Sequence, residues 1–217
     1  MAEIKAVIFD LDGTLYDKSH LPLRVVGRQI LHGKLFMLKR ERSVRKLLKG
    51  KYFGDKDRFE EAFFSHFKRK NAKEWFYETY MPDTIKILQK HYHIAQWVED
   101  CLKSLHDKGV KIAVFSDYGY VEEKLEAIGF DLKLTDYIFD APSLGGLKPS
   151  KEAFQKICET MNVAPQNCLM VGDRDDTDGA GAIAAGMQFK KIGVCVKKRP
   201  EIALKMLYVS KRDLKQA

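Results

Sequence analysis

The feature that most constrains the fold is a short apolar run that ends in two acids. Residues 6–9 read Ala-Val-Ile-Phe, and Asp10 and Asp12 follow one residue apart. An apolar run of this length without polar alternation is typical of a parallel strand covered on both faces. Gly13 and Thr14 then end the run. Because a buried carboxylate is costly unless a cation or hydrogen bonds compensate it, the two aspartates indicate a metal ion or another cationic partner.

From residue 97 onward, helical and extended patterns alternate along the chain. The predicted helices are residues 97–108, 120–128, 151–161 and 177–185, and the predicted strands are residues 110–115, 137–139, 168–171 and 190–196. Short strands that alternate with helices of this length are typical of β-α-β units. With a strand at residues 4–9, they predict an α/β fold built on a parallel, doubly wound sheet.

Residues 18–95 lack this alternation and are predicted to be helical throughout. Residues 17–95 hold 19 Lys and Arg against 9 Asp and Glu, so this part of the chain carries the whole positive excess of a protein with a net charge of +8. The simplest architecture is a helical module inserted after the first strand of an α/β core. Its charge is either a solvated helical face or a positive field that attracts an anionic ligand.

A nucleic-acid ligand would need the aromatic side chains of this module for stacking. Phe59, Phe63 and Phe67 instead follow one another at helical spacing, which indicates a small core within the module. We therefore expect a small anionic partner and do not favour nucleic acid.

The composition predicts a cytoplasmic protein without a membrane span. The chain of 217 residues has no apolar run long enough to cross a bilayer, and its first residues lack the features of a signal peptide. Cys101, Cys158, Cys168 and Cys195 lie far apart without the spacing of a zinc site, which indicates reduced core thiols. The sequence leaves the oligomeric state open.

Chemically useful side chains follow several of the predicted strands. In open parallel sheets the ligand lies at the carboxyl ends of the strands, where distant loops converge. The candidates there are Asp10, Asp12, Ser116, Asp117, Lys148 in the loop GGLKPS, and Asp173 in VGDRDDTD. Carboxylates from different strands make a hard-oxygen site that suits Mg²⁺. A hydroxyl and an ammonium group suit the oxygens of a phosphate.

These residues resemble the four ordered motifs of the haloacid dehalogenase-like hydrolase superfamily. The motifs are DLDGT at 10–14, Ser116 after a strand, Lys148 before a proline, and GDRDDTD at 172–178. The resemblance implies a Rossmann-like core with a helical cap inserted between the first two motifs. On this basis we predict a core of residues 1–16 and 96–217 and an α-helical cap domain of the C1 type at residues 17–95.

The resemblance also implies a role for each matched residue. Asp10 resembles the nucleophile and Asp12 the general acid and base. Ser116 and Lys148 resemble the phosphate ligands. Asp173 resembles the metal ligand that, with Asp10 and Asp12, holds Mg²⁺.

Two further acids are predicted to support the site. Asp178 is a second acid of the last motif that could orient Lys148 or a water on the metal. Asp117 is a departure from the pattern, because many relatives carry asparagine or another neutral residue there. It adds negative charge that can alter the choice of substrate.

Together these features predict a Mg²⁺-dependent phosphomonoester hydrolase that acts on a small phosphorylated metabolite through an aspartyl phosphate. The haloacid dehalogenase branch lacks the second acid, so Asp12 favours phosphate chemistry. A phosphomutase shares all four motifs and remains an alternative. The second alternative is a regulatory module that binds phosphate or metal without turnover.

Overall fold

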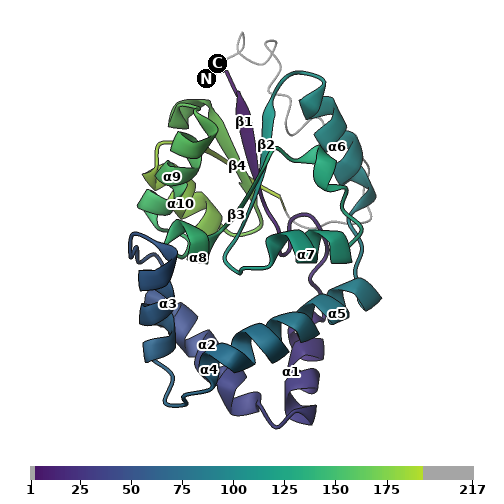
Figure 1. Ribbon diagram of the computed structural model, residues 1–217. Helices are drawn as coiled ribbons and strands as arrows, with labels where there is room; N and C mark the ends of the chain where they lie inside the picture. Colours follow the sequence, from purple (N-terminus) through teal and green to yellow (C-terminus); the bar gives the residue numbers. More distant parts are fainter. Residues whose placement is uncertain (1–2, 193–217) are drawn as a thin grey trace.

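A computed structural model describes residues 3–192 of the chain (Figure 1). Its centre is a sheet of five parallel strands in the order β3-β2-β1-β4-β5. The strands are β1 (Ala6–Asp10), β2 (Lys111–Ser116), β3 (Tyr137–Asp140), β4 (Cys168–Gly172) and β5 (Gln188–Lys191). The predicted α/β, Rossmann-like fold is confirmed. Among the described residues, no helix is both long enough and apolar enough to cross a membrane.

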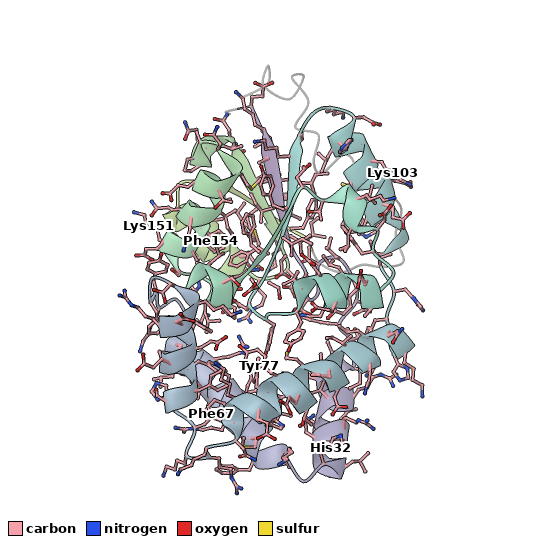
Figure 2. The ribbon with its side chains drawn as sticks, in the orientation of Figure 1. His32, Phe67, Tyr77, Lys103, Lys151 and Phe154 are labelled. Atoms are coloured by element: carbon pink, nitrogen blue, oxygen red, sulfur yellow. The ribbon has the colours of Figure 1, made fainter. Side chains whose placement is uncertain are left out.

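Helices cover both faces of this sheet (Figure 1). One face is covered by α8 (Ala141–Leu144), α9 (Lys151–Met161) and α10 (Ala180–Ala184), and the other by α6 (Gln96–His106) and α7 (Val121–Ala127). Ile8 and Phe115 pack with Phe154 of α9 in one core cluster, whereas Val7 and Phe9 belong to a second cluster on the opposite face. Figure 2 shows Phe154 between α9 and the sheet. The apolar run at residues 6–9 is buried because each face of the strand has its own helical layer.

Residues 18–95, which follow β1 and precede α6, form helices and no strand of the sheet, as predicted. The helices are α1 (Leu21–Leu31), α2 (Leu35–Leu48), α3 (Lys56–Ser65), α4 (Ala72–Glu74), the π-helix η1 (Trp75–Tyr80) and α5 (Met81–His91), and we call residues 21–91 the helical segment. In Figure 1 the helical segment lies below the carboxyl ends of the strands. Its core is aromatic: the Phe63 ring contacts those of Phe59, Phe67 and Phe76, although Phe67 lies beyond the end of α3.

Backbone and side-chain contacts hold the helical segment against the sheet layer. The Phe53 amide donates to the carbonyl oxygen of Gly145 at 2.7 Å, and Tyr52 forms an antiparallel bridge with Gly146. A Cβ on Gly145 would lie 2.7 Å from the amide nitrogen of Asp55, so only glycine permits this close approach. Gly145 and Gly146 lie just before Lys148 in the chain, so these contacts place the helical segment beside the loop that carries Lys148.

Some predicted elements differ in the structure. The predicted helix at 177–185 begins as the π-helical turn η4 (Asp175–Gly179) and continues as α10. The predicted strand at 190–196 is β5, which begins earlier and ends at Lys191; residues 193–196 lie outside the described part of the chain. Helix α8 and the 3-10 turns η2 (Leu132–Leu134) and η3 (Pro165–Asn167) were not predicted, because such short elements carry no detectable periodicity.

The thiols that the structure describes are buried and free. Cys101, Cys158 and Cys168 are buried side chains without a disulfide, as predicted, and Cys195 lies outside the described residues. The Sγ atoms of Cys158 and Cys168 lie 3.7 Å apart.

Candidate active site

A cavity of about 370 Å³ lies at the carboxyl ends of the strands, beside α1 and α5. Its acidic side chains are Asp10, Asp12, Asp117, Asp173 and Asp178, and its cationic side chains are Lys18, Arg42, Lys124, Lys148 and Arg174. The helical segment adds Leu21, Pro22, Val25, Tyr80, Met81 and Thr84. The cavity therefore has a charged wall at the strand ends and a mostly apolar wall on the helical segment.

Asp10 is the last residue of β1 and is buried. One carboxylate oxygen accepts a hydrogen bond from the Thr14 hydroxyl at 3.0 Å, and the other accepts one from Lys148 Nζ at 2.7 Å. Burial raises the pKa of Asp10 to about 7, although Lys148 acts in the opposite direction. A cation beside this carboxylate would favour its ionised form.

Lys148 is the most deeply enclosed cation of the cavity, with a side chain only 2% exposed. Its Nζ donates to Asp10 Oδ1, to Asp178 Oδ1 at 2.8 Å and to the carbonyl oxygen of Phe115 at 2.9 Å. Asp117 accepts the backbone amide of Lys148 at 2.9 Å, which anchors the loop that carries the lysine. Burial raises the pKa of Asp117, while Lys148 partly offsets this effect.

Asp12 faces a different cation from Asp10. Its carboxylate pairs with Lys124 of α7, accepts the Tyr16 hydroxyl, and accepts the Ser116 hydroxyl at 3.2 Å. Burial alone would raise the pKa of Asp12, but Lys124 and Tyr16 together lower it below its ordinary value. Ser116 is fully buried behind Asp12, so its hydroxyl is directed at this carboxylate.

Asp173 lies one residue beyond β4 and contacts Lys18. Lys18 Nζ is 2.6 Å from Asp173 Oδ2 and 2.7 Å from the backbone carbonyl oxygen of Asp12. Gly13 has a φ of +100°, and a Cβ there would lie 2.6 Å from both Asp173 Oδ2 and Lys18 Nζ. Glycine is needed at position 13 for its backbone conformation and for the space that these two groups occupy.

Three acids form the donor set that fits a divalent cation. Asp10, Asp173 and Asp178 each offer a carboxylate oxygen, and these atoms all lie within 4.8 Å of one another. Hard, anionic oxygens from separate loops are the ligands that Mg²⁺ takes in proteins. The Asp12 carboxylate, predicted as a ligand, faces Lys124 outside this set, whereas Asp178, predicted as a supporting residue, belongs to it.

The haloacid dehalogenase-like hydrolase family profile matches residues 4–186, which contain strands β1 to β4 and the residues that line the cavity just described. The chain belongs to this family. The match confirms the resemblance found in the sequence.

Known relatives of this family member cover most of its length. A Clostridium perfringens protein named for the pyrophosphatase PpaX is 31% identical over 86% of this chain and 85% of its own. A phosphoglycolate phosphatase from Aquifex aeolicus is 27% identical over 82% of this chain and 80% of its own. A phosphatase of the family from Thermococcus onnurineus superposes with a TM-score of 0.62 at 22% identity, covering 90% of this chain and 89% of its own. This last likeness confirms the fold.

The structure brings together the predicted site residues of this hydrolase and adds three cationic residues from outside its four motifs. Asp10, Asp12, Asp117, Lys148, Asp173 and Asp178 line one cavity, with Ser116 directly behind it. The added residues are Lys18, Arg42 and Lys124. They lie in a loop or on helices, where a lone basic residue has no pattern to separate it from surface lysines and arginines.

Proposed function

We propose that this hydrolase is a Mg²⁺-dependent phosphatase that acts on small phosphorylated metabolites through an aspartyl phosphate on Asp10. The observation that carries the proposal is the buried Asp10 at the end of β1, joined to Lys148 and lying within reach of Asp173 and Asp178. The names of the curated relatives support phosphate as the group removed.

The carboxylates of Asp10, Asp173 and Asp178 are proposed to hold Mg²⁺. When bound, the ion would reduce the repulsion between an anionic nucleophile and an anionic phosphate. Lys148 stays beside Asp10 and is proposed to stabilise negative charge on the transferring phosphoryl group.

Two carboxylates divide the remaining chemistry. Asp10 attacks phosphorus and the bond to the leaving oxygen breaks, while Asp12 gives that oxygen a proton. Asp12, now a carboxylate, takes a proton from a water that attacks the aspartyl phosphate and releases phosphate from Asp10. Lys124 favours the ionised form of Asp12, which suits the second step, whereas the first step uses the minor, protonated form. Ser116 is proposed to orient Asp12, because its hydroxyl donates to that carboxylate.

The helical wall suggests a substrate with a second anionic group. Arg42 of α2 lines the cavity, and within the part of the chain that the structure describes its side chain has no ion pair or hydrogen bond. An unpaired guanidinium can bind a carboxylate or a phosphate with two parallel hydrogen bonds. Pyrophosphate and phosphoglycolate, the substrates in the relatives' names, both carry a second anionic group. We therefore propose a small phosphate ester or anhydride with a second anionic group, and not a nucleic acid, as the substrate.

The division into domains belongs to the same proposal. Residues 1–16 and 96–217 would form the catalytic core, although residues 1–2 and 193–217 lie outside the described part of the chain. Residues 17–95 would form the cap that covers the cavity and selects the leaving group. The contact of Phe53 with Gly145, close to Lys148, supports communication between the two parts.

A panel of phosphorylated compounds, assayed by release of inorganic phosphate with and without Mg²⁺, tests the proposal. It should contain phosphoglycolate, pyrophosphate and a sugar monophosphate of similar size whose phosphate is its only charged group. We expect turnover only with Mg²⁺ and a preference for the two compounds that carry a second anionic group, with Asp10→Asn as the inactive control. Isomerisation of a sugar phosphate without release would favour the phosphomutase, and binding without turnover would favour the regulatory module.

A further inference from the structure

Lys18 bridges two oxygen atoms at the edge of the acidic donor set. Its Nζ is 2.6 Å from Asp173 Oδ2 and 2.7 Å from the backbone carbonyl oxygen of Asp12. Both are hard oxygen atoms, the type of ligand that a divalent cation takes. An ammonium group within hydrogen-bond distance of an oxygen and a metal ion on the same side of that oxygen exclude each other by size and by charge.

The two lysines on the donor set differ in their freedom to leave. Lys148 is 2% exposed and is held by two carboxylates and a carbonyl, so its departure would leave buried charges unpaired. The Lys18 side chain is 39% exposed, and its ammonium group lies at the end of a long flexible chain. Moving its ammonium group into water costs little in comparison.

The backbone around Lys18 is held in place while its side chain is free to rotate. The carbonyl oxygen of Lys18 accepts the amide of Leu21 at 3.0 Å, at the start of α1. The carbonyl oxygen of Ser19 accepts the Tyr92 hydroxyl at 2.8 Å. An exchange of the ammonium group for another cation therefore needs only side-chain rotation.

We propose that Lys18 is a displaceable counter-ion of the metal site, whose ammonium group competes with Mg²⁺ for Asp173. The proposal rests on the metal site of the proposed function. It adds that Mg²⁺ enters this site by replacing the ammonium group of Lys18. Lys18 neutralises Asp173 until the divalent cation takes its place, and it thereby weakens the apparent affinity for the metal.

The first test labels the wild-type protein with a small amount of acetic anhydride, with and without saturating Mg²⁺, and measures each lysine by peptide mass spectrometry. Lys18 should react several-fold faster with Mg²⁺, because its amine is released. Lys49 is the internal control: it is 37% exposed and pairs with Asp176 outside the cavity, so its labelling should not change. Unchanged labelling of Lys18 in metal-saturated protein would overturn the exchange.

The second test measures Mg²⁺ binding by calorimetry for the wild type, Lys18→Met and Lys49→Met. Loss of one part-exposed ion pair and one hydrogen bond should tighten Mg²⁺ binding by Lys18→Met roughly 5-fold, whereas Lys49→Met should match the wild type. Equal affinities in all three proteins would overturn the competition and leave the metal site intact. No binding by any of them would overturn the metal site, and the competition with it.

Discussion

The two walls of the cavity are built on different principles. At the strand ends, the acids are matched with lysines: Lys148 joins Asp10 to Asp178, and Lys124 pairs with Asp12. On the helical segment, the lining is largely apolar, and Arg42 has no partner among the described residues.

This difference indicates that the strand-end wall carries out the chemical steps and that the helical wall selects the substrate. A network of buried charges holds its members in one arrangement, because any member that moves leaves a partner unpaired. An apolar surface with one unpaired cation imposes no such arrangement and can instead bind the leaving group of a substrate. We expect substitutions in the strand-end wall to abolish turnover, and substitutions in the helical wall to change which substrate is accepted.

The strongest test of the strand-end wall compares its first two acids. Asp10→Asn should lower turnover about 10⁴-fold or more, because an amide does not attack phosphorus. Asp12→Asn should also lose turnover, yet with an activated substrate it should keep phosphate on Asp10, since the base for hydrolysis is missing. Intact-protein mass spectrometry after an acid quench measures both. Phosphate on the Asp10 variant would contradict the division of roles.

The second test removes the cation that holds this wall together. Lys148→Met should lower the free energy of unfolding by about 3–5 kcal/mol, because Asp10 and Asp178 are left as buried, unpaired charges. Denaturant unfolding without metal measures the loss. Adding Asp178→Asn to this variant should restore part of the stability, and Lys49→Met, which breaks an exposed pair, should change it by less than about 1 kcal/mol. Equal losses of stability in Lys148→Met and Lys49→Met would contradict the view that the strand-end wall is held together by buried charges.

The third test addresses the helical wall. Arg42→Met should raise KM for a substrate with a second anionic group about 10-fold, because a charge-assisted hydrogen bond is lost, and should leave kcat within about 3-fold. Its KM for a sugar monophosphate without a second anionic group should stay the same. Arg58→Met on α3, an exposed arginine that does not line the cavity, is the matched control. A loss of kcat alone would place Arg42 in the chemistry and erase the contrast between the walls.

The smallest expected effect concerns the positive charge of residues 17–95. If their 19 basic residues attract an anionic substrate, KM should rise about 2- to 3-fold between low and physiological ionic strength. Steady-state kinetics at constant Mg²⁺ measures this change. A flat KM would show that the basic residues are a solvated surface and that the helical wall selects by contact alone.

Much of the fold and part of the site could be predicted from short patterns. The apolar run at residues 6–9 ends in two acids, and this order already placed Asp10 and Asp12 at the mouth of a buried strand. The return of strands and helices after residue 97 predicted the parallel sheet, since burial on both faces leaves an unbroken apolar run. Lys148 and Asp173 followed from their motifs, and both line the cavity.

The partner of each charge was decided by tertiary structure. Ser116 is directed at Asp12, and Lys124 reaches the same carboxylate from α7, which packs against α5 and β3. Lys18 and Arg42 reach the cavity from the loop before α1 and from α2, parts of the chain whose many basic residues look alike in the sequence.

The physical reason is the range over which each property acts. Burial and the end of a strand are set by neighbouring residues, and they leave a local pattern of apolar and polar side chains. An ion pair forms between groups that may be 112 residues apart in the chain, as Asp12 and Lys124 are, and each half of it looks like an ordinary charged residue. The sequence by itself determined that acids gather at the ends of these strands, and only the packing of helices around them decided which cation each acid meets.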